Sequence, residues 1–239
     1  MIYVVGIGPG SPAGITAQAE AALEASDMIA GYDTYIDLIR ERFPGKQFLS
    51  TPMRKEPERC RMALEAGRKG TVSMICSGDP GVYGMAGLML ELAEEYGNPE
   101  IEIIPGVTAA CSGAALLGAP LGHDFAVISL SDLLTPWERI AQRLDAAGRA
   151  DFCICLYNPS SKKRGDYLKR ACEILLESRS PENGAGIVRN IGRSGQSVSV
   201  MTLGQLQNAE TDMFSTVFIG NSQTKVLNGK LVTPRGYRR

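Results

Sequence analysis

Short apolar, β-branched runs alternate with longer segments of helical periodicity along the whole chain. This alternation is typical of α/β proteins in which helices connect the strands of a mostly parallel sheet. The expected strands are residues 2–7, 71–76, 101–104, 125–130, 152–156, 186–190, 198–203 and 216–219. The expected helices are residues 16–25, 33–42, 57–69, 85–96, 137–147 and 165–177, where strong helix formers carry apolar residues three or four positions apart.

A segment rich in glycine and proline, residues 117–124, interrupts this alternation near the middle of the chain. Such segments are typical of domain boundaries. Because domains commonly have roughly 100–200 residues, the 239 residues suffice for two small domains. We therefore expect two α/β domains with an αβα arrangement and mostly parallel sheets, residues 1–117 and 118–239.

Composition restricts the classes of partner. Hydrophobic residues make up 44% of the chain and charged residues 21%, which indicates a globular protein with a real core. The net charge of −1 gives no global basic field for nucleic acid, so an anionic ligand has to meet local clusters of Arg and Lys. The chain starts in a strand pattern without a basic leader segment, and no apolar stretch approaches the ~20 residues that span a bilayer. We expect a cytoplasmic protein without membrane or nucleic-acid partners.

Six cysteines are scattered through apolar segments without CxxC spacing, which favours reduced core thiols and no metal site. Cys153 and Cys155 would share one face of a strand, so a soft-metal pair is the alternative. No histidine or third cysteine lies nearby in sequence to complete such a site.

Three glycine-rich turns follow expected strands, where open α/β sheets bind their ligands. They are residues 6–10, 77–84 and 105–110. Glycine lets the backbone turn tightly and approach a ligand closely. The first turn departs from a dinucleotide fingerprint, because Ser11 replaces the last glycine and Pro9 lacks an amide donor. Simple turns and close helix packing are the alternatives, and Asp79 is either a turn former or an acceptor for ligand hydroxyl or amino groups.

In their order and spacing, these turns resemble the tetrapyrrole methylase family, whose marks are GxGPG, GDP and PG(V/I)(T/S)A. Segments 53–56, 118–125, 129–137 and 157–159 resemble the branch that methylates carbon 17 of precorrin-3B or of cobalt-factor III. The resemblance implies a two-domain homodimer that binds S-adenosylmethionine, later released as S-adenosylhomocysteine, in the cleft between its domains. The implied cofactor positions are Pro9, Ser77, Gly78, Asp79, Val82, Thr108, Ala109, Asn158 and Ile191. Many members have a second small residue in place of Asn158-Pro159, so the contact there is expected to differ.

Methyl transfer from a sulfonium needs alignment of the acceptor carbon more than a covalent catalyst. The ring contraction that this branch performs also moves protons, for which His123 and Asp132 are candidates because both lie in the branch-specific segments. The alternatives are a turn residue for His123 and a helix N-cap for Asp132, given Thr135-Pro136 just beyond.

The implied substrate carries many carboxylates, so basic side chains are expected along its site. The candidates are Arg54, Lys55, Arg189 and Arg193, with Arg59, Lys162, Lys163 and Arg164 as further contributors. Each of them is equally consistent with a solvated surface charge. Other readings stay open: the same fold acting on another precorrin, uroporphyrinogen or a non-tetrapyrrole acceptor, a nicotinamide oxidoreductase, or a non-catalytic module that retains the pocket. The sequence does not decide between the metal-free and the cobalt-containing substrate.

Overall fold

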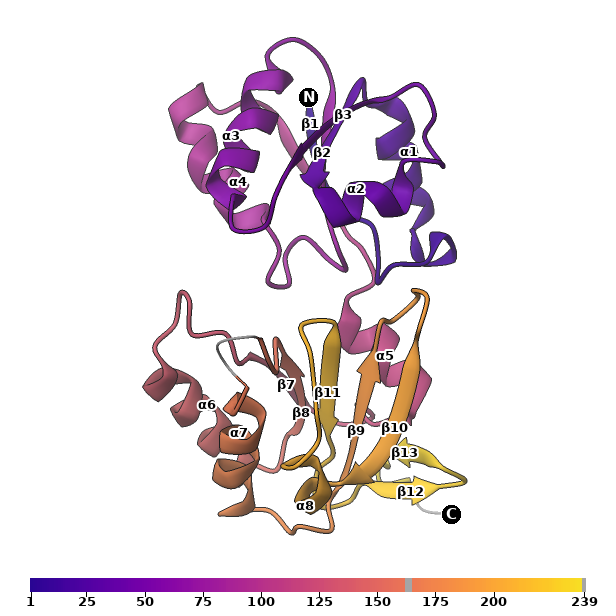
Figure 1. Cartoon of the computed structure of the whole chain (residues 1–239), viewed down its shortest axis with the longest axis vertical. Coiled ribbons are helices and arrows are strands. Elements are labelled where there is room, and N and C mark those ends of the chain that lie inside the picture. Colours follow the sequence, from indigo (N-terminus) through magenta and orange to yellow (C-terminus); the bar gives the residue numbers. More distant parts are fainter. Residues whose placement is uncertain (162–164, 238–239) are drawn as a thin grey trace. The chain divides into compact units, whose positions relative to one another are not determined.

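The computed structural model describes residues 1–161 and 165–237, so Lys162, Lys163 and Arg164 lie outside the described residues. Two compact units make up the chain, Met1–Ala109 and Ala110–Arg239 (Figure 1). The division falls before the glycine- and proline-rich segment at which the sequence analysis placed the boundary. Residues 110–117 belong to the second unit.

The N-terminal unit contains a five-stranded sheet in the order β3-β2-β4-β1-β5, and every pairing in it is parallel. The expected parallel α/β arrangement is confirmed here, and two further strands, β2 and β3, extend the sheet. Because β4, β1 and β5 are neighbours, their carboxyl ends and the three glycine-rich turns lie side by side at one edge. The strands are β1 (Ile2–Gly6), β2 (Met28–Tyr32), β3 (Gln47–Thr51), β4 (Val72–Cys76) and β5 (Ile101–Ile104).

Helices cover both faces of this sheet, as the alternation of its side chains requires. Val4 and Met74 point into a core with α3 and α4, whereas Val5 and Ile75 point into a core with α1 and α2. Thr16 caps α1, because its hydroxyl accepts a hydrogen bond from the Ala19 amide over 3.1 Å. The helices are η1 (Pro12–Gly14), α1 (Ala17–Ala25), α2 (Asp33–Ile39), α3 (Glu56–Gly67), α4 (Ala86–Ala93) and η2 (Glu94–Tyr96).

The second unit contains a five-stranded sheet in the order β10-β9-β11-β8-β7. Only β7 and β8 pair in parallel, and the other three pairings are antiparallel, which corrects the expectation for this sheet. Two parallel strands need a connection of a dozen or more residues between them, usually a helix. Between β9 and β11 the only helix is the four-residue α8, so these strands pair in the antiparallel direction. The strands of this sheet are β7 (Phe125–Ser129), β8 (Cys153–Tyr157), β9 (Gly184–Arg189), β10 (Ser197–Thr202) and β11 (Ser215–Ile219). A separate three-stranded sheet, in the order β12-β13-β6, consists of β6 (Gly118–Ala119), β12 (Lys225–Leu227) and β13 (Lys230–Val232).

Helices also cover both faces of the second sheet. Helices α6 (Trp137–Arg149), α7 (Tyr167–Leu176) and α8 (Leu203–Leu206) pack on the face that carries Ile154, Leu156 and Val217. Helix α5 (Ala109–Leu117) packs on the opposite face, where a Cβ added to Gly113 would lie 2.8 Å from the Phe218 ring. The small residues of α5 therefore let it approach the second sheet closely, which explains why it belongs to that unit.

Buried Arg179 ties several parts of the second unit together. Its guanidinium donates to the carbonyls of Gly148 and Phe152 over 2.8 Å each, and pairs with the Asp151 carboxylate at 2.6 Å. A further bond reaches the Ala147 carbonyl over 3.1 Å. These acceptors include the end of α6, where carbonyls lack intrahelical partners. Among residues 1–161 and 165–237, no helix has both the length and the apolar character that crossing a membrane requires.

Candidate functional site

The turns after β1 and β4 are joined by their backbones. Gly8 and Gly78 form an isolated antiparallel bridge, with N···O distances of 3.2 and 2.7 Å. Both residues have positive φ, 72° and 68°, a conformation that glycine adopts without steric cost. The glycines of these two turns thus serve a loop-to-loop contact that the sequence did not reveal.

The third turn enters the same cluster through Gly106. A Cβ added to Gly106 would lie 2.1 Å from the Gly78 carbonyl oxygen. A Cβ added to Gly6 would lie 2.6 Å from both that oxygen and the Gly106 amide nitrogen. No side chain fits at Gly6 or Gly106 unless the backbone moves, so this part of the sheet edge consists of main-chain atoms. Such a surface suits a ligand that is recognised by amide and carbonyl groups.

The Asp79 carboxylate fastens the second and third turns. One oxygen accepts a hydrogen bond from the Gly81 amide over 2.8 Å, and the other accepts from the Gly106 amide over 3.0 Å. From the sequence, this carboxylate is expected to be a turn former or a ligand acceptor. The structure gives it a bracing role that spans two segments far apart in sequence.

The remaining cofactor candidates of the first unit lie around this cluster. Pro9, Ser77, Val82 and Thr108 are half-buried, as is Ala109. The Val82 amide donates to the Asp79 carbonyl over 3.3 Å, which continues the turn. Tyr83, which carries no signal in the sequence, has a φ of 53° and is 56% exposed. A bulky residue in this strained region of backbone space is a feature that functional loops often contain.

Cys76 ends β4 directly before this site. Burial raises the pKa of its thiol to about 11, and burial also raises the pKa of the Cys60 thiol on α3 to about 12. Both groups are therefore neutral thiols at physiological pH. A thiolate beside an electrophile would react with it, whereas a protonated buried thiol is inert.

The second unit places its two cofactor candidates at one edge of its sheet. Asn158 follows β8 with a φ of 53°, and its amide nitrogen donates to the Ser129 hydroxyl at the end of β7 over 3.0 Å. Asn190, which has a φ of 50°, and then Ile191 follow the end of β9. The Ile191 side chain is only 7% exposed. Ile191 also borders Gly113 of α5, so its side chain has a packing role.

The two acid–base candidates lie at opposite ends of β7. His123 precedes the strand, is exposed, and its Nδ1 accepts a hydrogen bond from the Asp124 amide over 2.9 Å. Asp132 follows the strand, and its carboxylate accepts a hydrogen bond from the Tyr167 hydroxyl over 2.6 Å. A five-residue strand spans about 16 Å, so the two side chains do not share a site. The cap of α6 is Pro136, so Asp132 does not serve as its N-cap.

The basic candidates fall into two groups. Arg54, with a φ of 67°, and Lys55, paired with Glu58 at 2.9 Å, are exposed on the loop before α3. Arg189 donates to the Glu210 carbonyl and keeps a buried Nε without a hydrogen-bond partner, and Arg193 lies 5.5 Å from the centre of the Phe214 ring. Arg54 and Lys55 belong to the first unit, and Arg189 and Arg193 to the second.

Arg59, a further candidate, is 3% exposed. Its guanidinium donates to the Thr51 hydroxyl over 2.9 Å and to the Pro52 carbonyl over 3.1 Å. These contacts anchor the loop after β3 to α3. We therefore assign Arg59 a role in holding the loop that carries Arg54.

The described residues contain no group of three or more His, Cys, Asp or Glu side chains that would hold a metal ion. Cys153 and Cys155 are both fully buried in β8, and the Cys153 thiol lies 3.6 Å from the Thr233 hydroxyl. All six cysteines are free, and five are buried. Cys111 is the exception to the expected core placement, because it is exposed on α5.

Known proteins resemble this chain over nearly all its length. Residues 1–207 match the family model for tetrapyrrole (corrin/porphyrin) methylases. A probable cobalt-factor III C(17)-methyltransferase from Salmonella typhimurium is 47% identical over 239 residues, 99% of each chain. A cobalt-factor III methyltransferase from Priestia megaterium is 45% identical over 244 residues, which cover 100% of this chain and 45% of that protein.

Solved structures resemble the chain as well. The crystal structure of the methyltransferase CobJ has a TM-score of 0.91 and 38% identity, covering 98% of this chain and 99% of that one. Uroporphyrin-III C-methyltransferase from Thermus thermophilus, solved with S-adenosylhomocysteine, has a TM-score of 0.71 and 20% identity, covering 92% and 96%. The second likeness establishes a shared fold.

Proposed function

Because this chain belongs to the tetrapyrrole (corrin/porphyrin) methylases, we propose that it methylates carbon 17 of cobalt-factor III and contracts the macrocycle. The chain is a methyltransferase of cobalamin biosynthesis. The observation that carries the choice of acceptor is the 47% identity, over 99% of both chains, to a relative that bears this activity in its name. The metal-free precorrin-3B is the second acceptor to test, because the binding of cobalt is a property of the substrate.

The fold alone supports a wider range of acceptors. Uroporphyrin-III C-methyltransferase and diphthine synthase have the same fold at 20% and 19% identity. A fold does not determine a substrate, so these likenesses do not favour either acceptor for this chain. Another precorrin, uroporphyrinogen or a non-tetrapyrrole acceptor is therefore the alternative that an acceptor panel has to exclude.

We propose S-adenosylmethionine as the methyl donor, held by main-chain atoms of the glycine-rich turns. The close approach of Gly6, Gly78 and Gly106 leaves a surface without side chains, which fits recognition through amide and carbonyl groups. Asp79 would keep these turns in place through the amides of Gly81 and Gly106. The proposed positions are Pro9, Ser77, Gly78, Asp79, Val82, Thr108 and Ala109, with Asn158 and Ile191 from the second unit.

The chemistry that the cofactor supplies is an electrophilic methyl group on a sulfonium. The protein's part is to orient the acceptor carbon and to exclude water, which together lower the barrier without a covalent intermediate. Protonated Cys76 fits this role, because a neutral thiol beside the site does not compete for the methyl group. For proton movement during ring contraction we propose Asp132, since His123 lies at the other end of β7.

The basic side chains would meet the carboxylates of the acceptor. Arg54 and Lys55 are exposed on their loop, and the buried Nε of Arg189 still has a donor to offer. Arg193 completes the set. We propose further that the enzyme acts as a cytoplasmic homodimer on this small-molecule substrate, without nucleic-acid or membrane partners, and light scattering of the purified protein checks the dimer.

The proposed function is tested by cofactor titration followed by an acceptor panel. Isothermal titration should give micromolar binding of S-adenosylmethionine and S-adenosylhomocysteine and no binding of NAD. Cobalt-factor III, precorrin-3B and uroporphyrinogen III are then each incubated with the protein and S-adenosylmethionine under anaerobic conditions. Mass spectrometry should show addition of one methyl group to cobalt-factor III. Folded protein that binds NAD, or that methylates only uroporphyrinogen III, would rule the proposal out.

A further inference from the structure

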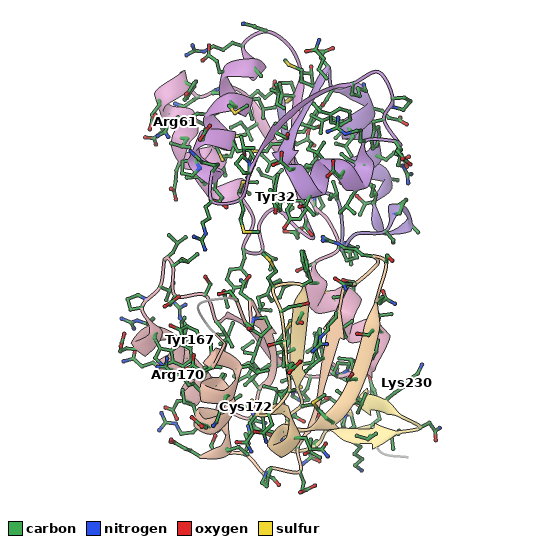
Figure 2. The ribbon with its side chains drawn as sticks, in the orientation of Figure 1. Tyr32, Arg61, Tyr167, Arg170, Cys172 and Lys230 are labelled. Carbon is green, nitrogen blue, oxygen red and sulfur yellow. The ribbon has the colours of Figure 1, made fainter. Side chains whose placement is uncertain are left out.

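A cluster of side chains joins the loop after β7 to the first turns of α6 and α7. The Tyr167 hydroxyl donates to the Asp132 carboxylate over 2.6 Å. The Tyr167 ring packs against Trp137, with ring centres 4.6 Å apart and planes at 55°. The Arg170 guanidinium lies 4.0 Å from the Trp137 ring centre and 5.1 Å from that of Tyr167. Figure 2 labels Tyr167 and Arg170 in the second unit. Tyr167 is thus held by two neighbours while its hydroxyl holds the carboxylate.

This cluster lies at the same sheet edge as Asn158. Strands β7 and β8 run parallel with Ser129 opposite Tyr157, so the loops that follow them are neighbours. The Ser129 hydroxyl accepts from the Asn158 side-chain amide over 3.0 Å and from the Ser131 backbone amide over 3.2 Å. The backbone that leads to Asp132 is therefore tied to a proposed cofactor position.

The stability of the fold does not account for this loop. Asp132 is exposed, and a hydrogen bond at an exposed position contributes little to the stability of the fold. The next two residues, Leu133 and Leu134, are 66% and 97% exposed, although burial of a leucine side chain would stabilise the fold. A fixed carboxylate followed by two exposed leucines is the surface that a ligand with an apolar face and N–H or O–H donors would contact. A tetrapyrrole has both.

We propose that Tyr167 is a positioning residue that orients the Asp132 carboxylate toward the tetrapyrrole, with Leu133 and Leu134 against the face of the macrocycle. This inference rests on the proposed function and adds to it the means by which Asp132 is held. In the proton transfer, a substrate O–H group gives its proton to the Asp132 carboxylate, the electron pair of the O–H bond stays on the substrate oxygen, and the carboxylic acid then releases the proton to solvent. Tyr167 acts only through Asp132, because its hydrogen bond restricts the orientation of the carboxylate.

The positioning role differs from simple bracing of the loop in a measurable way. If Tyr167 acts through Asp132, removal of the phenol hydroxyl has no further effect once the carboxylate is gone. If Tyr167 only braces the loop, the decreases in turnover that the two substitutions cause multiply. A double-mutant cycle on turnover therefore separates the two roles.

The experiment compares the wild type with Tyr167→Phe, Asp132→Asn and the double variant. Tyr237→Phe is the matched control, since Tyr237 is 84% exposed at the end of the described chain. For each protein we would measure kcat and KM with cobalt-factor III and the Kd of S-adenosylmethionine, which also verifies folding. We expect kcat to fall about 100-fold in Asp132→Asn, at the lower end of the usual range for acid–base groups. The fall in Tyr167→Phe should be smaller, about tenfold, because the carboxylate remains. The double variant should match Asp132→Asn, with cofactor Kd values within about twofold of the wild type.

If the wild type is active, two outcomes would overturn the inference. The first is a kcat in Tyr167→Phe equal to that of the Tyr237→Phe control. The second is a decrease in kcat of the double variant that equals the product of the decreases in the two single variants. A wild type that binds S-adenosylmethionine but methylates no tetrapyrrole would instead overturn the proposed function, and this inference with it.

Discussion

The backbone amide of Gly106 donates a hydrogen bond to the Asp79 carboxylate over 3.0 Å, which ties the turn after β5 to the turn after β4. The other carboxylate oxygen accepts from Gly81 within its own turn. One side chain thus sets the spacing of two main-chain segments that we propose to hold the cofactor.

Replacement of Asp79 by alanine should weaken S-adenosylmethionine binding by at least tenfold. The change removes the acceptor of two amides, and an unsatisfied partly buried donor costs about 1–3 kcal/mol. Isothermal titration with S-adenosylmethionine and S-adenosylhomocysteine measures the effect. Glu102→Ala removes the same charge from an exposed position on β5 and should bind like the wild type. Equal affinities for the two variants would show that the bracing is irrelevant to the cofactor.

Gly106→Ala should destabilise the first unit and abolish cofactor binding. The added Cβ would lie 2.1 Å from the Gly78 carbonyl oxygen, so the two turns must separate. The matched control is Gly87→Ala in α4, where nothing lies within 4 Å of the new Cβ and the free energy of unfolding should rise by about 0.5–1 kcal/mol. Urea unfolding and titration of both variants provide the measurement. Wild-type affinity in Gly106→Ala would contradict the close packing of the turns.

Arg179→Ala should lower the free energy of unfolding of the second unit by about 1–3 kcal/mol for each buried carbonyl that loses its donor. The variant leaves the Gly148 and Phe152 carbonyls and the Asp151 carboxylate without their guanidinium partner. Arg139→Ala changes an exposed residue on α6 and should stay within about 0.5 kcal/mol of the wild type. Urea unfolding followed by circular dichroism distinguishes the two, and a small loss in Arg179→Ala would refute the assigned role.

The stability of the protein should decrease as the pH rises above 9. Burial raises the pKa of the Cys172 thiol from 9.0 to about 12, and that of Cys76 to about 11. Above pH 9 the unfolded chain loses these protons while the folded chain keeps them, so the free energy of unfolding falls with pH. Urea unfolding at pH 8 and pH 10 measures the decline. Cys172→Ala should reduce this decline in the free energy of unfolding, whereas Cys111→Ala, at an exposed position, should leave the decline unchanged. An equal decline in both variants would argue against burial of the thiols as its cause.

The periodicity of the sequence predicted the α/β class and most strands, because buried parallel strands such as β4 read as continuous apolar runs. It missed β2, whose run includes Gly31, and β3, an edge strand whose residues are mostly not buried. The antiparallel pairings of the second sheet were not predicted either. The direction of β9, β10 and β11 depends on the short connections between them. The periodicity of apolar residues carries no information about strand direction.

The candidate site was predictable in outline and not in its contacts. The glycine-rich turns identified the edge of the first sheet, yet the bonds between Gly8 and Gly78 and between Asp79 and Gly106 join segments far apart in sequence. His123 and Asp132 flank one strand, so strand geometry alone places them at opposite edges. Tyr167 carried no sequence signal, because its role depends on the packing of α6 against α7.

The position of the transferred methyl group tests the central claim most directly. Cobalt-factor III would be incubated with the wild-type protein and S-adenosylmethionine that carries a ¹³C-labelled methyl group, and the product would be analysed by ¹³C NMR. The account predicts a single labelled methyl group bonded to carbon 17 of a contracted macrocycle. Label on any other carbon, or none transferred by protein that binds the cofactor, would contradict it.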